Sequence, residues 1–148
     1  MARWQRPLAA VAAGGALGAL ARWAVVGLGA SDASETITMA VNVAGSLLLG
    51  LLYGFRERLD PDLLLGLGTG FAGGFTTFST YAVAVATHLD DGDVLAAAAN
   101  GLGTPIAAVL AAGLGYRSSR LFGARPGSGR RRRRWRSRRT SSGGRWRR

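Results

Sequence analysis

The stretch from Thr69 to Tyr81 concentrates the polar groups best suited to contact a small ion. It carries five Ser or Thr residues and three Gly residues among apolar neighbours. Gly is about 1 kcal/mol worse than Ala in a helix interior, so the pair Gly73 and Gly74 favours a broken helix. A break would free carbonyl oxygens for a cation and N–H groups for an anion. A continuous helix, whose hydroxyls bond to its own carbonyls, fits the spacing equally well.

Aromatic residues accompany these polar groups. Phe75, Phe78 and Tyr81 recur every third residue, so a helix would place them on one face. Such a stripe usually reflects packing. An aromatic ring also has a positive edge, so rings presented edge-on along a polar track would stabilise a small anion without a formal charge.

Three polar residues elsewhere are further candidates. Asn42 and Ser46 lie one turn apart on a helix, and an Asn side chain can donate two hydrogen bonds to an anion, although such pairs also bind helices together. Arg22 lies within an apolar stretch, where an Arg costs about 3 kcal/mol near the bilayer centre. It should face a wet, anion-attracting vestibule or a polar partner, unless it snorkels to the interface.

The residues needed for other kinds of chemistry are absent or badly placed. All eight acidic residues lie in or beside the segments between apolar stretches, His88 is the single His, and the chain has no Cys. Proton-coupled export normally uses a titratable group within the membrane. Catalysis by a hydroxyl needs a neighbouring base, and thiolate chemistry needs Cys. The sequence therefore argues against an enzyme or an antiporter and favours a passive conduit.

Four apolar stretches supply the elements that must position these residues, and they cover residues 8–30, 36–55, 63–89 and 94–116. A helix that spans a membrane needs about 20 such residues. The first stretch is longer than the core of a signal peptide, and none has the polar face of a soluble helix. We therefore expect an all-α membrane protein with four transmembrane helices, the third broken near Gly73–Thr76.

Glycine spacing indicates how these helices pack. Membrane helices approach one another through small residues because lipid offers no hydrophobic drive for their association. Pairs of Gly four residues apart occur in the first three stretches, at positions 14 and 18, 50 and 54, and 66 and 70. We interpret these pairs as packing surfaces.

Charge divides the chain into two unlike parts. The 148 residues carry 19 Arg, 8 acidic residues and a net charge of +11, but 14 of the Arg lie at or after Arg117, leaving 5 − 8 = −3 for residues 1–116. We expect a membrane domain over 1–116 and an Arg-rich tail over 117–148 with a disordered composition. Arg residues precede the first stretch and follow the second and fourth, whereas the other connections carry only acids. The positive-inside rule then places both termini in the cytoplasm.

Three segments together resemble the fluoride channel family known as CrcB or Fluc. Residues 73–81, with the core GG-x-TTFST, resemble the signature of that family. Residues 42–46 are similar to its motif in the second span, and residues 14–23 to its pattern in the first. The resemblance extends from residue 8 to about residue 116 and leaves out the tail.

The resemblance implies a passive fluoride channel in the cell membrane, whose outward flow would relieve fluoride toxicity. It implies an antiparallel dimer with two pores and a structural sodium ion at the dimer centre, held by backbone carbonyls of Gly73 and Thr76. The pore residues that it implies are Asn42, Phe78, Ser79, Thr80 and Tyr81, with Arg22 attracting anions. The family usually has Phe at the position of Tyr81, so the extra hydroxyl either joins the polar track or alters selectivity.

The tail bears on the partners of the chain. An Arg-rich segment next to a membrane orients the protein and contacts anionic lipid; contact with nucleic acid would lack base specificity. An antiparallel homodimer must insert in both orientations, whereas this charge distribution favours one. We therefore expect pairing with an oppositely oriented homologue, and otherwise with a second copy. The alternative function is a membrane-embedded structural or signalling subunit whose tail binds lipid or nucleic acid.

Overall fold

The computed structural model describes residues 4–27 and 34–123, and these form an all-helical chain. Helices α1 (Gln5–Gly27), α2 (Ser34–Gly54) and α6 (Val94–Gly123) are long and apolar enough to cross a membrane. The remaining predicted span is divided into α3 (Pro61–Leu64), the π-helix η2 (Leu65–Ala72), α4 (Gly73–Phe75) and α5 (Ser79–Asp90). The expectation of an all-α chain with membrane-type helices is confirmed.

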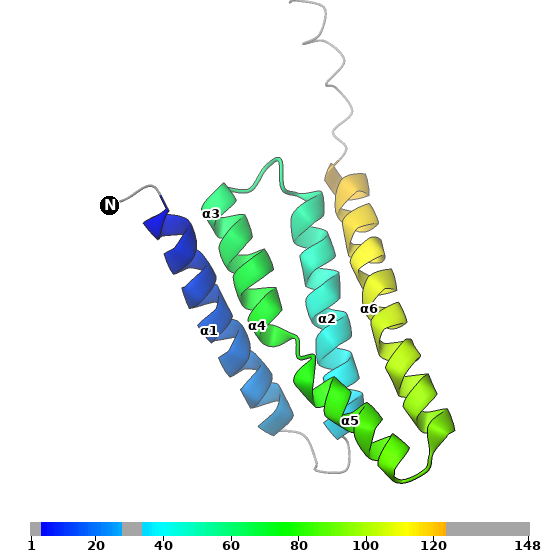
Figure 1. Cartoon of the computed structure of the whole chain (residues 1–148). Helices are drawn as coiled ribbons and strands as arrows, with labels where there is room; N and C mark the ends of the chain where they lie inside the picture. Colours follow the sequence, from blue (N-terminus) through cyan, green and yellow to red (C-terminus); the bar gives the residue numbers. More distant parts are fainter. Residues whose placement is uncertain (1–3, 28–33, 124–148) are drawn as a thin grey trace, which may run out of the picture.

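The helices lie side by side with one of them interrupted (Figure 1). Helix α2 packs mainly against α6, and α1 packs against η2 and α4. The helical run from α3 to α4 ends partway along the molecule, and α5 continues in a new direction until it contacts α6. The interruption therefore lies inside the helical layer and faces α2.

Short polar segments explain where two of the elements begin. Asp60 precedes α3 and its Oδ1 accepts hydrogen bonds from the N–H groups of Asp62 (2.9 Å) and Leu63 (3.3 Å), which is the action of an N-cap. Asp93 likewise accepts from the N–H of Ala96 at 2.9 Å near the start of α6. These caps stabilise the N-terminal ends of α3 and α6.

The predicted glycine surfaces lie at helix contacts. A Cβ added to Gly14 on α1 would overlap the carbonyl oxygen of Gly66 on η2, and one added to Gly50 on α2 would overlap the carbonyl oxygen of Ala112 on α6. Both overlaps involve backbone atoms, which have no rotamer by which to move away. The interpretation of these glycines as packing surfaces is confirmed.

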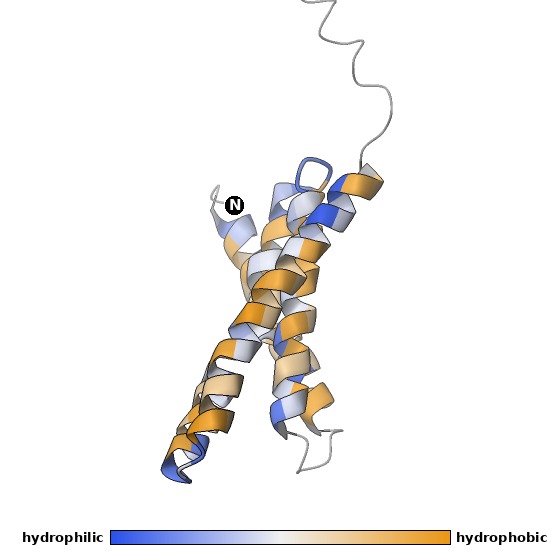
Figure 2. Cartoon of the chain, turned by 90° about the vertical axis from the view of Figure 1, so that its right-hand side faces the viewer, coloured by the Kyte–Doolittle hydropathy of each residue, from blue (hydrophilic) through white to orange (hydrophobic). Residues whose placement is uncertain are grey.

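Hydrophobic residues make up much of the length of the helices, and hydrophilic residues gather toward the two ends (Figure 2). Leu17, Val109 and Leu114 are 60%, 72% and 63% exposed, as expected of residues that would face lipid. At one end of the bundle Arg120 pairs with Glu57 at 3.2 Å. At the other end Nε2 of His88 lies 3.0 Å from a carboxylate oxygen of Glu35.

Helix α6 differs in length from the predicted span. The sequence predicts its end at Tyr116 and a disordered tail from Arg117, but the helix continues to Gly123. The hydroxyl of Ser119 bonds back to the Tyr116 carbonyl at 2.8 Å, and this side chain is fully buried. Packing of Ser119 against Gly54 on α2 explains why helical structure extends beyond the apolar stretch. The rest of the predicted tail lies outside the described residues.

Candidate functional site

The candidate site is the interruption between α4 and α5. Thr76 has an extended backbone, with ψ of 156°, and helical structure resumes at Ser79. The break thus follows the predicted glycine pair, because Gly73 and Gly74 are themselves helical in α4. Gly74 is needed for close packing instead, since a Cβ there would overlap the Gly15 carbonyl oxygen on α1. Of the two interpretations that the sequence left open, the broken helix is correct.

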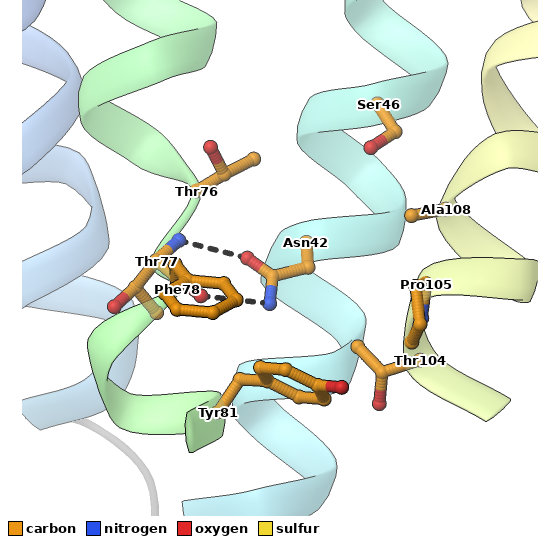
Figure 3. Close-up of a pocket in the computed structure, with 9 residues that line it drawn as sticks. All are labelled: Asn42, Ser46, Thr76, Thr77, Phe78, Tyr81, Thr104, Pro105 and Ala108. Atoms are coloured by element: carbon orange, nitrogen blue, oxygen red, sulfur yellow. Dashed lines mark hydrogen bonds between the residues drawn. The ribbon is translucent and has the colours of Figure 1, made fainter. Parts of the chain in front are cut away.

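Asn42 on α2 holds the break in place. Its Nδ2 donates to the carbonyl oxygen of Thr77 at 3.0 Å, and its Oδ1 accepts from the N–H of Thr77 at 2.8 Å. Figure 3 shows this amide facing the extended segment across the pocket. The side chain is buried, at 9% exposure. A backbone segment that no longer bonds within a helix thereby gains both of the partners that it needs.

The break also redirects backbone groups next to it. In a continuous helix the Gly73 carbonyl would accept from the N–H of Thr77, and the Thr76 carbonyl from the N–H of Thr80. Here the N–H of Thr77 donates to Asn42, and the N–H of Thr80 points to the Thr77 hydroxyl at 3.3 Å. The two carbonyls that the sequence resemblance implies as sodium ligands therefore both have their usual helical donors engaged elsewhere.

Arg22 approaches the same break from α1. Its Nε donates to the Gly74 carbonyl oxygen at 3.3 Å, and the side chain is half-buried. This carbonyl belongs to the last turn before the break, where helical partners run out. The structure thus provides the polar partner that an Arg in an apolar stretch requires.

A cluster of hydroxyls follows the break. The Thr77 hydroxyl lies 3.3 Å from that of Ser79 and 3.2 Å from that of Thr80. Ser79 and Thr80 are exposed on the single chain. The predicted polar track is therefore a contiguous cluster in which Thr77 is the central member.

The aromatic residues separate into two pairs, which corrects the prediction of a single stripe. The rings of Phe78 and Tyr81 lie 5.6 Å apart and are tilted by 50°, whereas Phe75 stacks on Phe71 at 5.8 Å. The extended segment between α4 and α5 breaks the helical spacing that would have aligned all three. Phe78 is 78% exposed, so its ring extends away from its own chain.

A pocket of about 290 Å³ lies between α2, the break and α6. Its lining, shown in Figure 3, includes Asn42, Ser46, Thr77, Phe78 and Tyr81. Thr104, Pro105 and Ala108 close it on the side of α6. The lining residues offer hydroxyl, amide and aromatic groups, and none of them is of a type that carries a charge at neutral pH. A second pocket of about 290 Å³ contains Gly73 and Thr76 in its wall.

Sequence reasoning missed three of the residues at this site. Thr77 lies within the motif of residues 73–81, but the hydrogen bonds of its backbone with Asn42, far away in the chain, leave no local signal in the sequence. Thr104 and Pro105 carried a usable signal, because a Pro and a polar residue inside an apolar span both disturb a membrane helix.

Together the fold and the site define a small membrane protein built around a discontinuous helix, the arrangement in which channels and transporters meet ions. A family model described as CrcB-like protein, Camphor Resistance (CrcB), matches residues 9–116. The chain belongs to this family, which confirms the resemblance seen in the sequence.

Several relatives cover most of the same region. The chain is 47% identical over 107 residues to the fluoride-specific ion channel FluC of Syntrophotalea carbinolica, covering 68% of this chain and 87% of that one. It is 48% identical over 109 residues to the fluoride-specific ion channel FluC 2 of Natronomonas pharaonis, covering 72% and 88%. It is 45% identical over 112 residues to the fluoride-specific ion channel FluC 1 of Rhodococcus jostii, covering 74% and 82%. These relatives are named as channels, in agreement with the expectation that the chain is not an enzyme.

Proposed function

We propose that this protein is a passive, fluoride-selective channel. The observation that carries the proposal is the neutral pocket at the helix break, where Asn42 holds the backbone open and the rings of Phe78 and Tyr81 lie beside hydroxyl groups. The names of the relatives supply the identity of the ion, because each of those compared is called a fluoride-specific ion channel.

The chemistry of the pocket suits fluoride. A small anion that enters a narrow pore loses hydrating water and needs replacement donors. The ring edges of Phe78 and Tyr81 in the pocket wall carry partial positive charge. The hydroxyls of Ser79 and Thr80, which lie beside that of Thr77 just outside the pocket lining, can donate. These neutral groups bind an anion weakly enough for it to leave again. Asn42 shapes this track by orienting Thr77, and Arg22 attracts anions from the α1 side.

The direction of flow follows from the membrane potential. We propose that the protein lies in the cell membrane with both termini in the cytoplasm, so that an inside-negative potential drives fluoride outward and lowers its toxicity. The arrangement of the helices supports this orientation, because the start of α1, the end of α2 and the end of α6 all lie at one end of the molecule (Figure 1). The Arg-rich tail would contact anionic lipid at the same surface.

An antiparallel dimer accounts for the exposed aromatic residue. Phe78 is 78% exposed on a single chain although it stands beside the polar pocket, so a partner subunit would cover it and complete the pore wall. A structural sodium ion at the centre of this dimer would take carbonyl oxygens of Gly73 and Thr76 from each subunit. Oxygen donors from unwound backbone suit a hard cation, and the redirected N–H groups of Thr77 and Thr80 support this fit.

The partner is expected to be a homologue of opposite orientation, and otherwise a second copy. This can be tested with a single Cys placed at the C-terminus of the chain, which has no other Cys. When the chain is expressed alone in cells, we expect an impermeant thiol reagent to label that Cys only after the membrane is opened. Equal labelled and protected populations would contradict pairing with a homologue and favour the homodimer.

Fluoride efflux from liposomes tests the function itself. We expect vesicles that are loaded with fluoride and contain the purified chain, together with its homologue or as a dimer of copies, to release fluoride when a potassium ionophore permits charge balance. Phe78→Ile should slow release strongly, because it removes the exposed ring edge from the pore. Phe122→Ile is the matched control, since Phe122 lies at the far end of α6 with 86% exposure. Absence of release by the wild-type chain, alone or with a homologue, would favour the alternative of a structural or signalling subunit.

A further inference from the structure

Helix α6 contains a proline in its interior, and this leaves one carbonyl without its usual donor. Pro105 has no N–H, so the carbonyl of Gly101, four residues earlier, lacks the helical hydrogen bond that it would otherwise accept. In a membrane span such a carbonyl must find another donor, because lipid offers none.

The donor is the side chain of Tyr81. Its hydroxyl donates to the Gly101 carbonyl oxygen at 2.5 Å. Figure 3 shows the Tyr81 ring reaching from α5 across the floor of the pocket toward Thr104 and Pro105. The Tyr81 hydroxyl therefore replaces the backbone donor that Pro105 lacks.

We propose that Tyr81 is a positioning residue coupled to Pro105, and that its hydroxyl is not a fluoride ligand. A phenol has one proton to donate, and here the Gly101 carbonyl receives it. The oxygen that remains offers only lone pairs, which repel an anion, so Tyr81 contributes its ring edge alone. The hydrogen bond fixes that ring 5.6 Å from Phe78 and ties α5 to α6. The transport part of this proposal rests on the proposed function, and the coupling itself does not.

A consequence is that a Tyr at position 81 and a Pro at position 105 form a matched pair. A Phe at position 81 would leave the Gly101 carbonyl unpaired as long as Pro105 is present. An Ala at position 105 would restore the N–H donor and make the hydroxyl of Tyr81 dispensable for the stability of α6.

Four proteins test the coupling: the wild type, Tyr81→Phe, Pro105→Ala and the double variant. Reversible unfolding in mixed detergent micelles gives the ratio of folded to unfolded protein. We expect Tyr81→Phe to lower this ratio on the order of fivefold when Pro105 is present and to leave it nearly unchanged when it is combined with Pro105→Ala. Tyr116→Phe, on the same helix as Pro105, is a matched removal of a phenol hydroxyl and should have little effect in either background. Equal losses from Tyr81→Phe in both backgrounds would overturn the coupling.

Fluoride flux separates positioning of the ring from stability. We expect Tyr81→Phe to conduct several-fold more slowly and to keep its preference for fluoride over chloride, because the ring stays but is no longer fixed. The double variant should regain stability without regaining flux, since nothing holds its ring. A change in fluoride preference would instead place the hydroxyl on the ion and overturn the positioning role. If the wild type conducts no fluoride, the proposed function fails, and the unfolding measurements still decide the coupling.

Discussion

Replacing Asn42 with Ala is expected to remove fluoride conduction almost completely. The substitution deletes both hydrogen bonds that hold Thr77, at 3.0 and 2.8 Å, and leaves an N–H and a carbonyl unpaired at the helix break. An unpaired buried polar group costs about 1–3 kcal/mol. With two such groups, the extended conformation at the break is destabilised by several kcal/mol in all. We expect flux to fall by more than about tenfold, since about 1.4 kcal/mol already corresponds to a factor of ten.

Two further variants make this prediction specific. Asn42→Asp keeps an acceptor for the N–H of Thr77 but cannot donate to its carbonyl, and it adds a buried negative charge, so it should conduct no better than Asn42→Ala. Ser46→Ala removes a polar group from the same pocket one turn away on α2 and should leave the break intact. Wild-type flux in Asn42→Ala, with normal flux in Ser46→Ala, would show that Asn42 is not needed to hold the pore.

The second large effect is expected from Gly14→Ala. The new Cβ would overlap the carbonyl oxygen of Gly66, and neither backbone can yield unless α1 moves away from η2. Overpacking of a well-packed core typically costs about 1–3 kcal/mol, sometimes more, and contact with backbone places this substitution at about 3 kcal/mol or above. Reversible unfolding in detergent micelles would show this as a large loss of folded protein.

A matched substitution elsewhere controls for the effect of Ala itself. Gly113 lies in α6, and nothing lies within 4 Å of a Cβ added there in the described part of the chain. Because Ala is the better helix former by about 1 kcal/mol, Gly113→Ala should be neutral or stabilising. Equal stability of Gly14→Ala and Gly113→Ala would contradict the close contact between α1 and η2.

Much of this architecture follows from local sequence. Apolar length predicts the long helices, small-residue spacing predicts the contacts at Gly14 and Gly50, and the glycines and polar residues of the third span predict that it is interrupted. Each of these features depends on nearby residues, so a single sequence is sufficient to find it.

The features that the sequence did not predict depend on distant partners. The break lies at the Thr76 end of the predicted range Gly73–Thr76, because Asn42, from another helix, stabilises Thr77. Gly74 instead serves packing against α1. The prediction of a single aromatic stripe was wrong for the same reason, since the break separates Phe75 from Phe78. The role of the hydroxyl at position 81 was left open because its acceptor lies on α6 and is freed only by the proline there.

The reversal potential of a planar bilayer containing the purified protein tests the central claim most directly. With fluoride at different concentrations on the two sides and chloride equal, a passive fluoride-selective pore must reverse its current at the fluoride equilibrium potential. We predict a reversal potential equal to the fluoride equilibrium potential, and we predict that it stays constant when the chloride gradient alone is varied. A reversal potential that follows chloride, or the absence of any current from the chain both alone and with its homologue when a fluoride gradient is imposed, would contradict the account.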